Sequence, residues 1–98
     1  MVKRLKCIIH GRVHGVFYRD TTSRKASTLG LTGFVENQQD GTVLAVAEGE
    51  KVLLEEFLAC LWKGSPLSKV ARVDATWDEA TGEWSGFTIR YRNFLDRF

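Results

Sequence analysis

The sequence predicts an α+β domain in which two helices cover one face of an antiparallel sheet. One observation behind this prediction is that several stretches alternate apolar and polar residues with the period of two of a β-strand. The other is that two further stretches repeat apolar residues with the helical period. Along the chain the order is strand, helix, strand, strand, helix, strand, followed by a short last strand or strand extension. This order is typical of the ferredoxin-like βαββαβ sandwich.

The first strand and helix are predicted between the N-terminus and Gly30. Alternation over residues 5–9 predicts a strand that continues towards Val13. Residues 11–19 contain two glycines and predict a loop, after which Asp, Thr and Thr at 20–22 offer N-cap side chains for a helix. Gly30 is placed to end that helix in a left-handed conformation.

Strand, turn and helix signals continue through the rest of the chain. Residues 32–38 and 42–48 are predicted as strands, and alternation recurs over residues 71–77 and 87–91. The Asp40-Gly41 pair between the first two of these stretches predicts a hairpin turn. Residues 51–63 place apolar side chains on one helical stripe, and Gly64 is expected to end that second helix.

Length and composition restrict the class of protein. Ninety-eight residues support one domain, with 44% hydrophobic and 27% charged residues as in soluble globular proteins. No apolar run approaches the roughly 20 residues that span a bilayer, and no signal-peptide core follows the basic N-terminus. Two cysteines without metal-ligand spacing predict free thiols, and a formal charge of +2 from scattered residues argues against a nucleic-acid surface. We therefore expect a cytoplasmic protein that binds neither nucleic acid nor membrane.

The predicted topology brings two candidate segments together. A right-handed crossover makes the first two strands parallel, with the third strand between them. The loop after the first strand and the end of the second strand then emerge at the same edge of the sheet, two strand spacings or roughly 10 Å apart. An arginine side chain and a bound phosphate can bridge that gap.

The loop over residues 14–19 has the features of an anion-binding site. It leads into a helix N-terminus, where free N–H groups and the helix dipole favour an anion. Gly15 permits close approach of a ligand and positive φ, and Arg19 adds a planar fork suited to phosphate oxygens. Asn37, near the end of the second strand, has an amide that both donates and accepts, so it can hold a water. Taken singly, the glycine also fits an ordinary turn, and the asparagine fits the start of the coming turn.

Two segments together resemble one known family. Residues 11–19, Gly-Arg-Val-His-Gly-Val-Phe-Tyr-Arg, closely resemble the first signature of the acylphosphatases. Residues 30–37, Gly-Leu-Thr-Gly-Phe-Val-Glu-Asn, followed by Asp-Gly-Thr-Val at 40–43, resemble the second. The similarity continues through residues 64–66 and 87–90 and covers nearly the whole chain.

The resemblance implies a hydrolase of the ferredoxin-like fold that cleaves carboxyl–phosphate mixed anhydrides without metal or cofactor. It implies that Arg19 binds the phosphate and that Asn37 positions the attacking water. The expected phosphate-binding loop comprises His14, Gly15, Val16, Phe17, Tyr18 and Arg19. The expected ligands are a small acyl phosphate as substrate and inorganic phosphate as product and inhibitor.

Two departures and two alternatives accompany this interpretation. His14 stands where the family usually has glutamine, which leaves the backbone cradle intact but alters loop hydrogen bonds. We expect residues 1–98 to form one domain, in which residues 92–98 extend beyond the usual end of the family. This extension bears on the assembly state, which we expect to be monomeric. An RNA-recognition domain has the same element order but needs aromatic residues on its first and third strands, which are absent from those strands here. A regulatory domain that binds acyl or carbamoyl phosphate without turnover is the closer alternative.

Overall fold

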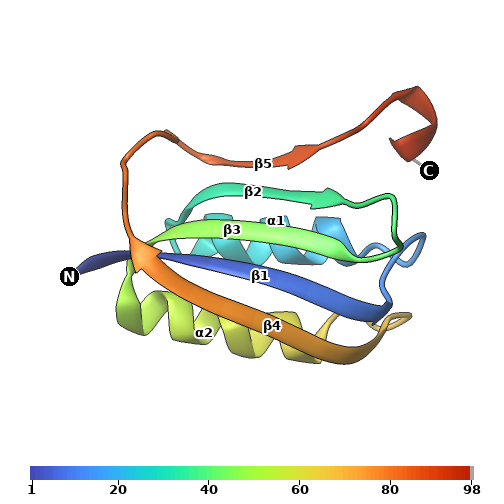
Figure 1. The fold of residues 1–98 in the computed structure, drawn as a ribbon, viewed down its shortest axis with the longest axis horizontal. Coiled ribbons are helices and arrows are strands. Elements are labelled where there is room, and N and C mark those ends of the chain that lie inside the picture. The colour runs from blue at the N-terminus through green and yellow to red at the C-terminus, as the bar shows by residue number, and fades with distance from the viewer. Residues whose placement is uncertain (98) are drawn as a thin grey trace.

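The computed structural model describes residues 1–97 of the chain. Its elements in chain order are β1 (Val2–Arg12), α1 (Tyr18–Thr28), β2 (Thr32–Asn37), β3 (Val43–Glu50), α2 (Lys51–Lys63), β4 (Lys69–Glu79), β5 (Phe87–Arg90) and a 3₁₀ turn, η1 (Phe94–Arg97). The five strands form one sheet in the order β4-β1-β3-β2-β5, and both helices lie on the same face of it (Figure 1). Within residues 1–97, no helix is both long and apolar enough to cross a bilayer.

The sheet topology confirms the ferredoxin-like prediction and corrects one part of it. β3 is antiparallel to both β1 and β2, so those two strands are parallel to each other with β3 between them, as expected. β5, however, pairs in parallel with β2, so the sheet is mixed and not purely antiparallel. β4 and β5 lie at opposite edges, and the connection between them crosses the end of the sheet before β5 enters beside β2 (Figure 1).

Helix α1 begins earlier than the sequence predicts. The sequence predicts capping by the side chains at 20–22, but the helix begins at Tyr18. Its N-cap residue, Phe17, has left-handed φ 61° and ψ 25° and caps the helix with no side-chain hydrogen bond. The chain turns sooner because Gly15, at φ 69°, and Phe17 both adopt positive φ in the loop. At the other end the prediction is confirmed, since Gly30 follows the helix at φ 70°.

The core fixes the starting point of α1. The fully buried inner face of β1, formed by Leu5, Cys7 and Ile9, packs in the same core as residues from both helices. Tyr18, the first residue of α1, is also fully buried, and its hydroxyl donates a hydrogen bond of 2.7 Å to the carbonyl oxygen of Leu61 in α2. This bond ties the end of the loop to the second helix. Both cysteines are free among residues 1–97, and burial raises the pKa of the Cys7 thiol to about 12.

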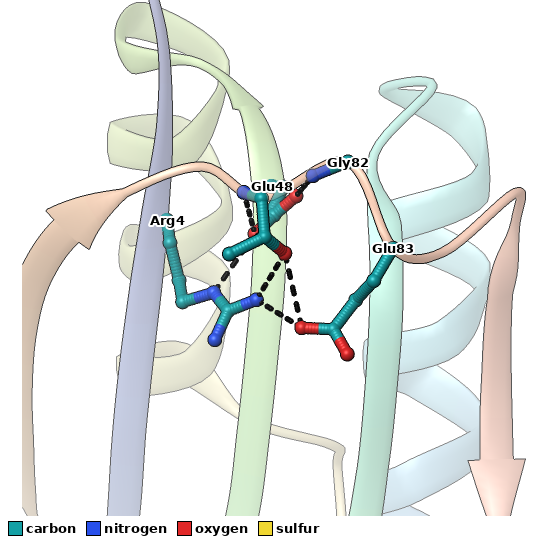
Figure 2. Close-up of polar contacts among 5 residues, drawn as sticks. Arg4, Glu48, Gly82 and Glu83 are labelled. Atoms are coloured by element: carbon teal, nitrogen blue, oxygen red, sulfur yellow. Dashed lines mark hydrogen bonds and ion pairs between the residues drawn. The ribbon is translucent and has the colours of Figure 1, made fainter.

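A buried carboxylate holds the crossing segment between β4 and β5. Glu48 of β3 accepts hydrogen bonds from the backbone N–H groups of Thr81 and Gly82, each at 2.9 Å, and from Arg4 Nε at 2.8 Å (Figure 2). Arg4 also pairs with Glu83. The Glu48 network lies at the end of the sheet opposite Asn37, and it fixes the connection that delivers β5 to the edge of β2.

Candidate active site

The two predicted segments meet at one end of the sheet. The loop from β1 to α1, the end of β2 and the C-terminal turn η1 all lie at this end (Figure 1). A cleft of about 330 Å³ there is lined by the loop, by Arg19 and by Tyr91, which follows β5. A second hollow beside it includes His14, Asn37 and Asp96. The topology thus places the candidate residues as the sequence predicts.

The loop turns its carbonyl oxygens towards protein donors. The Val16 oxygen accepts from Ser65 Oγ at 2.6 Å, and the Phe17 oxygen accepts from both the N–H and the hydroxyl of Thr21. That Thr21 bond is the first of helix α1, so the N–H groups at positions 18–20 have no acceptor within the helix. A left-handed residue such as Phe17 costs roughly 1–3 kcal/mol and is typical of ligand-binding loops. The arrangement leaves a helix N-terminus with donors suited to an anion.

His14 connects the loop to the turn between β2 and β3. Its Nε2 lies 2.8 Å from the carbonyl oxygen of Thr42. A carbonyl oxygen only accepts, so Nε2 carries the hydrogen, and the ring is oriented by this bond. The other ring nitrogen, Nδ1, does not contact Thr42. A direct role of His14 in phosphate binding therefore remains a prediction.

Arg19 lies in the first turn of α1, and its guanidinium is held from two sides. Its side chain is 12% exposed and lies 5.0 Å from the centre of the Tyr91 ring, a cation–π distance. Nη1 donates to Asp96 Oδ2 at 3.2 Å, and Nη2 donates to the Asp96 carbonyl oxygen at 2.5 Å. Nη1 also donates to the Arg90 carbonyl oxygen at 3.4 Å, so the fork faces oxygens of β5 and of the C-terminal turn, with Asp96 as its acidic partner.

Asn37 is the last residue of β2, and it reaches the same residue. It is only 5% exposed, and its Nδ2 donates to Asp96 Oδ1 at 3.2 Å. Because a carboxylate oxygen cannot donate, the amide nitrogen must face Asp96 and the amide oxygen must face away from it. That oxygen, Oδ1, is buried and has no hydrogen-bond partner among residues 1–97. A buried acceptor without a partner is rare in proteins and calls for a donor such as water.

Asp96 is the site residue that sequence reasoning missed. It belongs to the C-terminal extension and carries no motif or periodicity that could have singled it out. Burial by itself would raise the pKa of its carboxyl. The N–H of Arg92, the charge of Arg19 and the amide of Asn37 outweigh burial and hold the pKa below its usual range. An ionised carboxylate therefore joins the two residues that the sequence predicts as catalytic.

Comparison with known proteins shows the family to which the chain belongs. The acylphosphatase family model matches residues 5–89. The acylphosphatase of Pelotomaculum thermopropionicum is 39% identical over 88 residues, which make up 90% of this chain and 96% of that protein. The crystal structure of acylphosphatase from Bacillus subtilis superposes with a TM-score of 0.88 at 34% identity, covering 93% of this chain and 100% of that one. An acylphosphatase structure from Coxiella burnetii gives a TM-score of 0.84 at 32% identity, covering 91% and 93%. The chain therefore belongs to the acylphosphatase family.

Proposed function

We propose that the protein hydrolyses the carboxyl–phosphate bond of acyl phosphates to a carboxylate and inorganic phosphate, by direct in-line attack of a water on phosphorus. Arg19 and the loop amides hold the phosphoryl group, and Asn37 places the water. The observation that carries this proposal is the convergence of Arg19 and Asn37 on one anionic group, with the Asn37 amide oxygen buried and without a hydrogen-bond partner in the described part of the chain.

The phosphoryl group is bound through charge and N–H donors. The Arg19 guanidinium is planar and presents two parallel donors, which match two oxygens of a phosphate. The N–H groups at positions 15–19 approach from the helix N-terminus, where the dipole favours negative charge. Donors fixed before the reaction stabilise the charge that spreads over the equatorial oxygens in the transition state.

Asn37 acts on the nucleophile. Its Oδ1 accepts a hydrogen from the water and its Nδ2 donates to a phosphoryl oxygen, so that a water lone pair faces phosphorus. The new bond forms between the water oxygen and phosphorus, while the bond from phosphorus to the acyl oxygen breaks. The carboxylate departs with the bonding electron pair, and the water gives its proton to solvent. Holding the reacting atoms in this geometry contributes several kcal/mol by itself.

The leaving group explains why so few residues suffice. A carboxylate is a weak base, with a conjugate-acid pKa of about 4, so it leaves without a general acid. An alkyl phosphate ester has a much more basic leaving group, which requires protonation. The site therefore fits an acyl phosphate better than a phosphomonoester.

Phosphate release from benzoyl phosphate tests the proposal. We expect hydrolysis that EDTA does not reduce, competitive inhibition by inorganic phosphate, and little action on p-nitrophenyl phosphate. Activity that chelation abolishes and a divalent cation restores would contradict the metal-independent mechanism. Tight binding of acyl phosphate without phosphate release would favour the regulatory domain.

A further inference from the structure

The C-terminal segment, residues 91–97, runs from β5 to the active site and places a carboxylate there. The Asp96 side chain is 3% exposed. Its Oδ2 accepts from Arg19 Nη1 at 3.2 Å and from the backbone N–H of Arg92 at 2.9 Å. Its Oδ1 accepts from Asn37 Nδ2 at 3.2 Å and forms an ion pair with Arg92 Nη2 at 3.9 Å. Four nitrogen groups thus surround one anion.

These contacts use the donors that the proposed mechanism assigns to substrate. Arg19 and the Asn37 nitrogen face Asp96, so a phosphoryl group needs the same hydrogen bonds. The carboxylate and a phosphoryl group are both anions, and at close range in a partly buried site they repel each other. Binding of one therefore excludes binding of the other in this geometry.

Hydrogen bonds and ion pairs hold Asp96 at the site, which favours its displacement by another anion. Leu95, the apolar residue before Asp96, is 77% exposed. Within the segment, the Asp96 N–H donates to Asn93 Oδ1 at 3.1 Å. The match to the family model ends at residue 89, so the whole segment lies beyond the matched residues. Opening it breaks none of the pairings between β2 and β5, which end at Arg90.

We propose that Asp96 is an internal competitive inhibitor, which the C-terminal segment places on Arg19 and Asn37 until an acyl phosphate or inorganic phosphate displaces it. The inference rests on the proposed function for the identity of the substrate. Competition between the Asp96 carboxylate and inorganic phosphate does not depend on that function. A closed-to-open ratio of r raises the apparent phosphate Kd and the apparent KM by a factor of 1 + r, because only the open state binds. The value of kcat does not change, since saturating substrate keeps the segment open.

The test compares Asp96→Asn, Asp96→Ala and the unchanged full-length chain. For both variants we expect inorganic phosphate to bind about tenfold more tightly by calorimetry and KM for benzoyl phosphate to fall by a similar factor at unchanged kcat. The matched control is Asp78→Asn, which removes the same charge from an exposed position on β4, at the far edge of the sheet from β5. It should leave both constants unchanged. Thermal unfolding of each variant shows whether the fold is retained.

A second readout follows the segment itself. Saturating the unchanged chain with inorganic phosphate should speed amide hydrogen exchange at Arg92 and Asp96, because the hydrogen bonds of these N–H groups open with the segment. Slower exchange would show that the segment closes over the ligand, and would overturn the inference.

The outcomes separate the two proposals. An unchanged or weakened phosphate affinity in both Asp96 variants overturns the inference, whatever the turnover. The same result with rapid hydrolysis of benzoyl phosphate leaves the proposed function intact. Tighter phosphate binding in the variants without hydrolysis by any of the proteins supports the inference and contradicts the proposed function.

Discussion

Replacing Asn37 with alanine removes the group that we propose orients the water, so turnover and phosphate binding should respond differently. Without the amide oxygen the water loses its fixed position, and a displacement of about 1 Å can lower the rate about 100-fold. That loss in kcat corresponds to about 2.7 kcal/mol of transition-state stabilisation. Arg19 and the loop amides remain, so most of the phosphate affinity is retained although the Nδ2 contact to a phosphoryl oxygen is lost. It becomes tighter if the closed state is weakened by the lost contact to Asp96.

The same variant has an expected effect on stability. Truncation to alanine removes a hydrogen bond to a charged group, worth about 1.5–3 kcal/mol. The free energy of unfolding should therefore fall by about that amount. A fully buried apolar residue truncated to alanine loses about 2–5 kcal/mol.

Three measurements on Asn37→Ala check this reasoning. These are the kinetics of benzoyl phosphate hydrolysis, calorimetry with inorganic phosphate, and urea unfolding. Gln38→Ala is the matched control, since it removes the neighbouring neutral amide just after β2 and should leave kcat unchanged. If Asn37→Ala had the same kcat as the unchanged chain, or no longer bound phosphate, the water-positioning role would be refuted.

The remaining predictions concern binding, acid stability and the loop. Arg19→Lys should weaken phosphate binding and reduce kcat/KM about 100-fold, because an ammonium point charge does not replace the two-pronged contact; near-natural values would contradict this. Burial favours a raised pKa for Glu48, but two backbone N–H groups and Arg4 hold it below its usual range. Stability from Glu48 is therefore present above the unfolded pKa, about 4.3, and is lost as pH falls through the folded value. Urea unfolding should show Glu48→Gln less stable by about 2 kcal/mol at pH 7 and less sensitive to acid than the unchanged chain. His14→Gln should keep most activity, since a glutamine amide can also donate to the Thr42 oxygen; a tenfold loss would show that the imidazole acts directly.

Much of the fold was predictable because local signals agreed with the topology. The helix at 51–63 was predicted with its observed bounds, since its apolar stripe and the terminal Gly64 indicate the same segment. The parallel pairing of β5 was not, because a four-residue strand has too short an alternation to show which neighbour it joins. The early start of α1 depends on left-handed Phe17, a conformation that a non-glycine residue rarely adopts and that propensity does not predict.

The site was predictable to the extent that its residues belong to regular elements. Arg19 and Asn37 sit at the start of a helix and the end of a strand, so the order of strands brings them together. The position of the Asp96 side chain depends on the path of a short irregular segment. Its contacts with Arg19, Asn37 and Arg92 arise from tertiary folding alone. Neither charge nor spacing in the sequence distinguishes it from other surface carboxylates.

The central claim is that water attacks phosphorus, and oxygen-isotope labelling tests it most directly. Benzoyl phosphate should be hydrolysed by the enzyme in ¹⁸O-labelled water, and both products examined by mass spectrometry. Attack on phosphorus breaks the bond between phosphorus and the acyl oxygen, so the account predicts one ¹⁸O in inorganic phosphate and none in benzoate. Label in benzoate would mean that water attacks the carbonyl carbon. The roles of Arg19 and Asn37 proposed above would then be wrong.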